Sequence, residues 1–142
     1  MILISACLLG VPCRHDGSAL AAVNLPAEFS GQALLPLCPE ELGGLFTPRP
    51  AAELLGGDGE AVLAGAARAV LADGADVTAA FRRGAEAAAE LARRHGVRVA
   101  CLKSGSPSCG AGRTHIGGRV APGLGVAAAA LSRAGVRLIE AG

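Results

Sequence analysis

The stretch TAAFRRGAEAAAELARRHGVRVACL, residues 78–102, decides the fold class. Its first part intersperses Ala, Phe and Leu with Arg and Glu, which predicts an amphipathic helix that Asp76 or Thr78 caps and Gly96 ends. The apolar run Val97–Leu102 follows at once and predicts a strand. A helix that leads directly into a strand is typical of α/β proteins.

Shorter patterns on either side of this unit extend the prediction. The apolar residues 2–6, 33–37 and 136–139 predict further strands, and residues 125–134 predict a helix that Gly135 ends. Other stretches are less regular. Residues 19–31 suggest a helix before Gly31, and residues 46–60 are rich in Pro and Gly and suggest irregular structure. Residues 61–72 fit a strand or a helix, and Gly117-Gly118 suggests a tight turn. We therefore expect one compact α/β domain over residues 1–142, with a parallel, Rossmann-like sheet flanked by helices.

Composition excludes several classes of protein. The net charge is +1 and the only aromatic residues are three Phe, so neither a basic field nor a stacking surface for nucleic acid is expected. No apolar run approaches the length of a membrane span, and the N-terminal run breaks at Gly10-Val11-Pro12, so we expect no membrane segment and no signal peptide. These features favour a cytoplasmic protein, in which cysteines more often serve metal binding or catalysis than disulfides.

Three of the five cysteines follow apolar runs that are predicted to be strands, two of them directly and one across a loop. Cys7 follows Ile2-Leu3-Ile4, Cys38 follows residues 34–37, and Cys109 follows Val97–Leu102 across a polar loop. The ends of parallel strands gather at one edge of a sheet, so the three thiols are expected to meet in one pocket. Three thiolates with one open coordination position form a chemically active site rather than a structural one.

The other two cysteines have simpler explanations. Cys101 lies inside a strand pattern, where cysteine is often a small buried hydrophobe. Cys13 lies six residues after Cys7 across Pro12 and competes with it for a place in the site. Neither Cys7/Cys13 nor Cys101/Cys109 has the two-residue spacing of a structural zinc site. The histidines also lack a ligand spacing, and the sequence Gly123–Ala128 matches a dinucleotide fingerprint without the strand it needs, so tight helix packing is the better interpretation.

Polar residues beside these cysteines are candidates for chemistry. Glu40, two residues after Cys38, is an acid/base candidate or a helix-capping residue. Lys103 is the one Lys beside twelve Arg, which suggests a specific role for its ammonium. Ser104, Ser106 and Ser108 belong to a turn whose hydroxyl and N–H groups can face an anion or a base edge, although loop composition also explains them.

Several motifs together resemble a small bacterial and archaeal family, the thiouracil desulfidases, long known only as a domain of unknown function. The matching motifs are Ile4–Gly10, Cys13–Gly17, Cys38–Glu40 with Gly43–Leu45, Pro48–Pro50, Gly74–Thr78 and Ser106–Gly110. The resemblance covers essentially the whole chain. One departure is His15, where the family usually has Tyr.

The resemblance implies a [4Fe–4S] cluster held by Cys7, Cys38 and Cys109, with the fourth iron free for the substrate's sulfur. It also implies that Glu40 and a serine, Ser106 or alternatively Ser104, handle protons. The expected substrate is a small molecule, thiouracil or thiouridine monophosphate, which is converted to the oxo base and sulfide.

The remaining polar residues are assigned to substrate binding. We expect Ser104 and Ser108 to contact the substrate, and Lys103, Arg14 or Arg49 to hold a phosphate if the substrate is a nucleotide. Two other classes remain open: a non-catalytic iron–sulfur or zinc protein that stores, senses or passes sulfur or electrons, and a redox enzyme with Cys7 and Cys13 as a dithiol.

Overall fold

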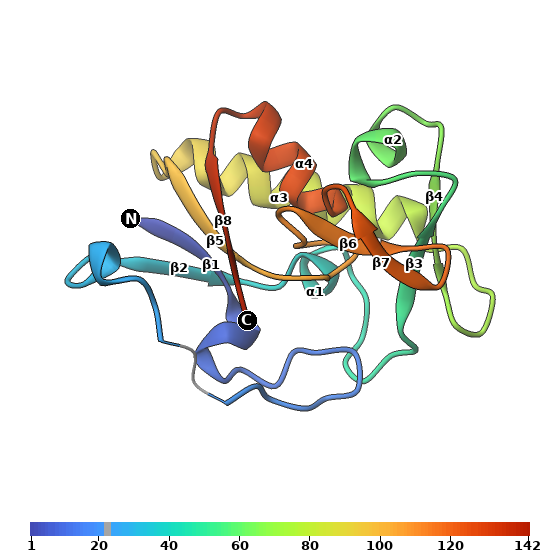
Figure 1. The fold of residues 1–142 in the computed structure, drawn as a ribbon, viewed down its shortest axis with the longest axis horizontal. Helices are drawn as coiled ribbons and strands as arrows, with labels where there is room; N and C mark the ends of the chain where they lie inside the picture. Colours follow the sequence, from blue (N-terminus) through green and yellow to red (C-terminus); the bar gives the residue numbers. More distant parts are fainter. Residues whose placement is uncertain (22–23) are drawn as a thin grey trace.

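A four-stranded parallel sheet forms the centre of the protein, as the sequence predicts. The computed structural model describes residues 1–21 and 24–142. In sheet A the strands lie in the order β2-β1-β5-β8, and all three pairings are parallel (Figure 1). Their bounds are Ile2–Ser5 for β1, Leu34–Leu37 for β2, Val99–Lys103 for β5 and Arg137–Ala141 for β8. Each of the four predicted strands is therefore present.

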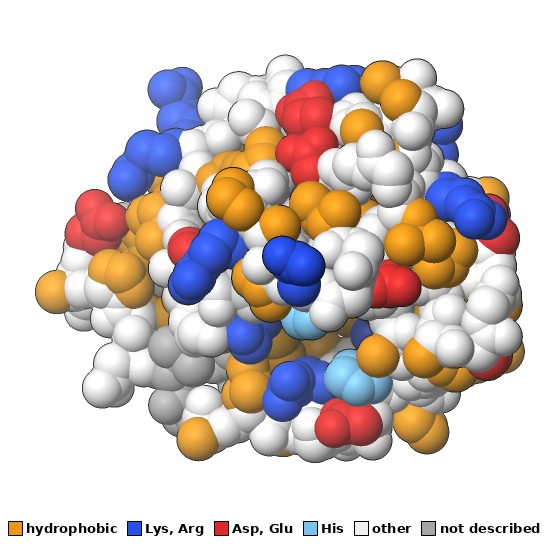
Figure 2. All heavy atoms as spheres, turned by 45° about the vertical axis from the view of Figure 1, so that its right-hand side comes forward, with side chains coloured by type: hydrophobic (Ala, Val, Ile, Leu, Met, Phe, Trp, Pro, Cys, Tyr) orange, Lys and Arg blue, Asp and Glu red, His pale blue; other side chains and the backbone are white. Residues whose placement is uncertain are grey.

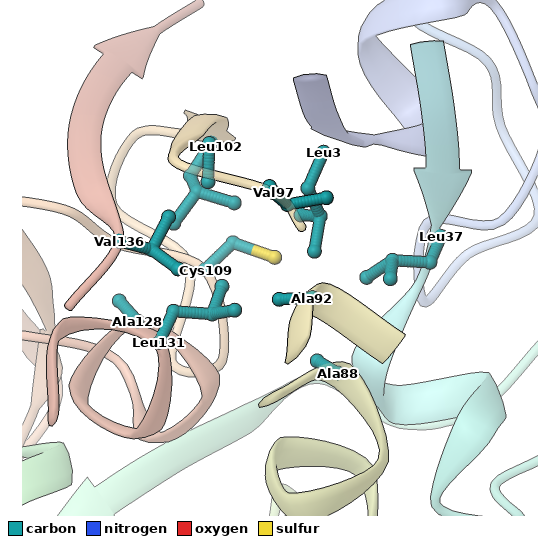
Figure 3. Close-up of a cluster of buried hydrophobic side chains, with 11 residues drawn as sticks. Leu3, Leu37, Ala88, Ala92, Val97, Leu102, Cys109, Ala128, Leu131 and Val136 are labelled. Carbon is teal, nitrogen blue, oxygen red and sulfur yellow. The ribbon is translucent and has the colours of Figure 1, made fainter. Parts of the chain in front are cut away.

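Helices α3 (Thr78–Arg94) and α4 (Val126–Arg133) pack on one face of this sheet. Figure 3 shows the resulting core, in which Leu3 from β1 meets Ala88 and Ala92 from α3 and Leu131 from α4. The N-cap residue of α3 is Val77, which makes no side-chain cap bond, and the preceding Asp76 accepts a hydrogen bond of 2.9 Å from the Thr78 N–H at its Oδ1. Neither of the two expected caps stands at the N-cap position, although Asp76 still binds the first amide of the helix.

Among the described residues, loops and 3-10 helices rather than an α-helix cover the opposite face of sheet A. This layer contains the 3-10 turns η1 (Ala6–Leu9) and η2 (Ala27–Phe29). Its buried side chains pack on Ile2, Ile4 and Cys101 of the sheet. The helix expected within residues 19–31 is wrong for the described part, which holds only η2; residues 22–23 lie outside the described residues.

A second, mixed sheet is the main feature that the sequence pattern does not predict. Sheet B has the order β4-β3-β6-β7, with β3 parallel to β6 and the two outer pairings antiparallel. Its strands are β3 (Ala52–Leu55), β4 (Arg68–Leu71), β6 (Arg113–Ile116) and β7 (Arg119–Pro122), and the predicted turn at Gly117-Gly118 joins the last two. Residues 46–60 thus contain a strand, and residues 61–72 contain both the end of helix α2 (Gly59–Leu63) and β4. These strands are four residues long, which is too short to give a clear alternation.

Close backbone contacts hold the functional loops against the helices. Helix α1 (Pro39–Leu42) packs on α3, where a Cβ at Gly84 would lie 1.9 Å from the Pro39 carbonyl oxygen. A Cβ at Gly125 would lie 2.5 Å from the Ser108 carbonyl carbon, so glycine lets the N-terminus of α4 contact the loop before Cys109. This close packing explains the glycines of the apparent dinucleotide fingerprint. No helix of the described residues is long and apolar enough to cross a membrane.

Candidate functional site

A cavity of about 560 Å³ opens where the strands of sheet A end, between that edge and sheet B. Figure 2 shows basic and histidine side chains around a hollow on this side of the molecule. All ten residues that the sequence analysis selected line the cavity: Cys7, Cys38, Cys109, Glu40, Ser106, Lys103, Ser104, Ser108, Arg14 and Arg49. The prediction that strand ends would bring distant residues together is met in the structure.

The three expected ligand cysteines reach the cavity from three different segments. Cys7 lies in η1 directly after β1, Cys38 caps helix α1 directly after β2, and Cys109 follows the loop at the end of β5. Cys13 is 3% exposed and lines the same cavity, and its carbonyl oxygen lies 3.8 Å from the Cys38 sulfur. Cys101 is fully buried within β5, where it packs in the core and contributes nothing to the cavity wall.

Burial keeps these thiols in their neutral form. It raises the pKa of Cys7 and Cys38, and it raises the pKa of Cys13 and Cys109 to about 12. A thiol with such a pKa becomes a thiolate when a metal replaces its proton. All five cysteines are free, so none of these sulfurs is used in a disulfide.

The donor set suits an iron–sulfur cluster. Three soft sulfur donors on one cavity wall are the ligands that such clusters use. Within residues 1–21 and 24–142, no three His, Cys, Asp or Glu side chains converge as the ligands of one metal ion would. A cluster binds each thiolate through a different iron, so its ligands stand further apart. The residues present therefore fit a three-thiolate cluster.

Glu40 is the acidic side chain in the cavity wall, and it is hydrogen-bonded at both oxygens. Its Oε1 accepts a bond of 3.0 Å from Arg49 Nε, and its Oε2 accepts one of 2.9 Å from the Ser108 hydroxyl. The ion pair is buried, with side-chain exposures of 5% for Arg49 and 11% for Glu40. Burial is the largest single effect and opposes the charge of the guanidinium, but the charge and hydrogen bond of Glu40 together with Cys38 and Glu41 raise the pKa of Arg49. Glu40 is thus held in place in the cavity wall and is not a helix cap exposed to solvent.

Arg49 uses its N–H groups within the protein. Besides Glu40, they contact the Cys13 carbonyl oxygen at 3.1 Å, the Thr47 hydroxyl at 2.7 Å, the Phe46 carbonyl oxygen at 3.4 Å and the Cys38 sulfur at 4.0 Å. The guanidinium therefore ties the Cys13 loop to helix α1. This geometry fits a positioning residue. Because its N–H groups are already hydrogen-bonded, Arg49 has no free donor for the substrate phosphate that the sequence analysis expects it to hold.

Ser106 and Ser108 form one hydrogen-bonded unit beside Cys109. Their hydroxyl oxygens lie 3.1 Å apart, and Ser106 Oγ accepts the backbone N–H groups of Ser108 at 3.2 Å and Cys109 at 3.0 Å. The loop is fixed from sheet B, because the buried Thr114 hydroxyl donates to the Ser106 carbonyl oxygen at 2.9 Å. The structure thus connects Glu40 with Ser106 through Ser108.

Lys103 and Ser104 lie at the end of β5, on the rim of the cavity. The Lys103 ammonium donates to the Ser104 carbonyl oxygen at 2.9 Å and to the Gly142 oxygen at 2.8 Å. The Ser104 hydroxyl also donates to Gly142. Both residues line the cavity, but their side chains bond to Ser104 and Gly142. In the sequence they lie further from Cys109 than Ser106 does.

Sequence reasoning missed two cavity residues, Arg113 and His115 of β6. They lie on the wall that sheet B provides, and His115 Nδ1 lies 3.0 Å from the Gly105 carbonyl oxygen. Together with Arg14 and Lys103 they make the lining basic. The only signal for them was the short pattern of residues 113–116, which reveals a strand only once sheet B is known.

Comparisons with known proteins agree with this site. The sequence model of a family described as 2-thiouracil desulfurase matches residues 2–141. The chain is 42% identical over 143 residues to the uncharacterised protein YbbK of Bacillus subtilis (strain 168), covering 99% of this chain and 95% of that protein. A solved structure of the [4Fe-4S]-dependent thiouracil desulfidase TudS is similar with a TM-score of 0.81 and 40% identity, covering 98% of this chain and 89% of that one.

Proposed function

We propose that this protein is a [4Fe–4S]-dependent desulfidase. The premise is that the chain belongs to the 2-thiouracil desulfurase family. The desulfidase removes sulfur from a thiolated pyrimidine and releases the oxo base and sulfide. The family and the similar structure of a [4Fe-4S]-dependent thiouracil desulfidase support this activity. The observation that carries the proposal is the meeting of three thiols, those of the buried Cys7 and Cys109 and the half-buried Cys38, with a hydrogen-bonded carboxylate in one cavity.

Cys7, Cys38 and Cys109 would hold the cluster as thiolates. They come from the loops after three adjacent strands, so the sheet itself sets their separation. When bound, the cluster would supply a soft Lewis acid for the sulfur of a thiocarbonyl group. Cys13 lines the same cavity but follows no strand, and we assign it no ligand role.

Glu40 is the proposed general base. Its carboxylate is fixed at both oxygens, by Arg49 and by Ser108, and lies in the wall of the cavity that holds the thiols. A base in this place can take a proton from the water that attacks the thiocarbonyl carbon. Ser106 is the proposed donor to the ring nitrogen as charge develops there. Arg49 positions Glu40 and does not contact substrate.

The basic side chains of the lining are suited to a phosphate on the substrate. Arg14 and Arg113 line the cavity. Lys103 lines it too, but its ammonium bonds to Ser104 and Gly142 and would have to give up one of these bonds to reach a phosphate. A thiouridine monophosphate would place its phosphate against these groups, whereas free thiouracil would use only the inner part of the cavity. Ser104 remains a candidate contact at the rim. We assign the protein to the cytoplasm, where a reducing environment keeps five free cysteines reduced.

Turnover by the reconstituted protein tests the proposal. The protein is purified without oxygen, loaded with iron and sulfide, and given thiouracil or thiouridine monophosphate, while release of the oxo product and of sulfide is followed. We expect a brown protein that turns over many equivalents of at least one substrate. The matched controls are the metal-free protein and the Cys101→Ala variant, which changes a thiol outside the cavity.

A brown protein that retains sulfur without repeated turnover would instead indicate a storage or sensing function. A colourless protein that binds zinc in place of iron would contradict the cluster. Turnover that needs a thiol reductant and no iron would favour the dithiol chemistry of Cys7 and Cys13.

A further inference from the structure

The hydroxyl group of Ser108 lies between the two side chains to which the proposed function gives proton chemistry. It is 2.9 Å from Glu40 Oε2 and 3.1 Å from Ser106 Oγ. Ser108 is 3% exposed, so water does not readily replace these bonds. Glu40 and Ser106 come from segments 66 positions apart in the chain (106 minus 40), and no direct bond between them is present among the described contacts.

The direction of this chain of hydrogen bonds follows from the inventory of donors and acceptors. Ser106 Oγ already accepts two backbone N–H groups, those of Ser108 and Cys109. A hydroxyl oxygen has two lone pairs, so in this structure the Ser106 hydrogen is directed to the Ser108 oxygen, and the hydroxyl has to turn away from Ser108 before it can donate to the ring nitrogen of a substrate. The Ser108 hydroxyl in turn donates to Glu40. The order is therefore Ser106 to Ser108 to Glu40.

The backbone at Ser108 makes this arrangement rigid. The Ser108 carbonyl oxygen accepts the N–H groups of Ala127 at 2.9 Å and Ala128 at 3.1 Å, at the start of α4. Arg49 holds the other oxygen of Glu40 at 3.0 Å. Both ends of this chain of hydrogen bonds are thus fixed by elements of the fold, and the Ser108 hydroxyl is the one described link between them.

From this geometry we infer that Ser108 is a positioning residue: its hydroxyl group orients the Glu40 carboxylate and the Ser106 hydroxyl, so that the two act as one unit. The inference rests on the proposed function, and it changes the role expected for Ser108 from substrate contact to orientation of the two proposed proton-handling groups. Because Ser108 acts through Glu40 and Ser106, its loss should lower kcat and leave substrate binding nearly unchanged.

The test compares Ser108→Ala with Ser108→Thr, which keeps a hydroxyl group, and with Ser132→Ala, an exposed serine of α4. We expect Ser108→Ala to keep its iron and its affinity for the uracil product in equilibrium dialysis, but to lose about 10- to 100-fold in kcat. Ser108→Thr should recover most of this loss, and Ser132→Ala should match the wild type. The double variant Ser108→Ala/Glu40→Gln should lose no more than Glu40→Gln alone, since residues that act as a unit are not additive.

Several outcomes would overturn the inference. Unchanged kcat in Ser108→Ala, additive losses in the double variant, or a loss of affinity for uracil equal to the loss of kcat/KM would each do so. Loss of iron from Ser108→Ala would show a scaffold role for the Cys109 loop instead.

Crystal structures of the two variants give a readout that needs no turnover. The Glu40 carboxylate should turn away from its wild-type orientation in Ser108→Ala and keep it in Ser108→Thr. If the wild type itself has no desulfidase activity, the proposed function fails, while this structural comparison still decides whether Ser108 orients Glu40. An unmoved carboxylate in Ser108→Ala would refute the inference.

Discussion

The Glu40→Gln variant separates the structural and catalytic contributions of the buried carboxylate. Gln has nearly the same shape but cannot take a proton, so we expect turnover to fall about a hundredfold or more while iron is retained. The variant also leaves the Arg49 guanidinium charged in a site where the two side chains are 5% and 11% exposed. Removing one partner of a buried ion pair typically costs about 3–5 kcal/mol. The amide oxygen can still accept the Arg49 N–H, so we expect the lower end, about 3 kcal/mol.

A double variant distinguishes these two effects. In Glu40→Gln/Arg49→Met both charges are absent and the volume is similar, so the free energy of unfolding should recover part of the loss. Turnover should stay at the level of Glu40→Gln. The measurements are urea unfolding of the cluster-free proteins, iron per chain after reconstitution, and steady-state release of uracil. The matched control is Glu86→Gln, at an exposed glutamate of α3, which should change stability by no more than about 0.5 kcal/mol.

Near-normal turnover by Glu40→Gln with a full complement of iron would refute the role of Glu40 as base. Another group would then activate the water. If Glu40→Gln instead loses its iron, the carboxylate serves mainly to hold the site together. Equal losses of stability in the single and double variants would show that the unpaired guanidinium does not cause the destabilisation.

Three further predictions concern the cysteines. Cys7→Ala, Cys38→Ala and Cys109→Ala should each lose most of the cluster, whereas Cys101→Ala should keep it; iron and acid-labile sulfide per chain measure this, and full iron in Cys109→Ala would contradict the ligand set. Cys13→Ser should also keep its iron, and loss of the cluster there together with retention in Cys7→Ser would reverse the two assignments. Burial raises the pKa of Cys13 and Cys109 from 9.0 to about 12. The neutral thiols therefore make their full contribution to the stability of the cluster-free protein below pH 9, and this contribution falls as the pH rises toward 12. Urea unfolding at pH 8 and pH 10.5 should show this fall, and a shallower one in Cys109→Ala; equal slopes would count against it.

The sequence by itself was sufficient to predict the parallel sheet and the position of the site at the edge of that sheet. The central strands of sheet A, β1 and β5, are short buried runs, the edge strands β2 and β8 are mostly apolar but partly exposed, and the helix that begins at Thr78 has a clear period, so local patterns identify them. Because parallel strands end at one edge, the positions of Cys7, Cys38 and Cys109 after three runs were enough to predict a common cavity. The resemblance of the motifs to a family supplied the cluster and the chemistry, which spacing alone does not specify.

Only the tertiary structure decided what surrounds the thiols. Sheet B consists of strands of four residues, and its cavity residues Arg113 and His115 have no local signal. The bond between Ser108 and Glu40 joins positions 68 residues apart, and the capture of Arg49 by Glu40 depends on how two loops pack. Periodicity reports which face of an element is buried, because burial imposes a repeat on neighbouring residues. It contains no information on which polar groups meet across the fold, since those contacts arise only when separate elements pack together.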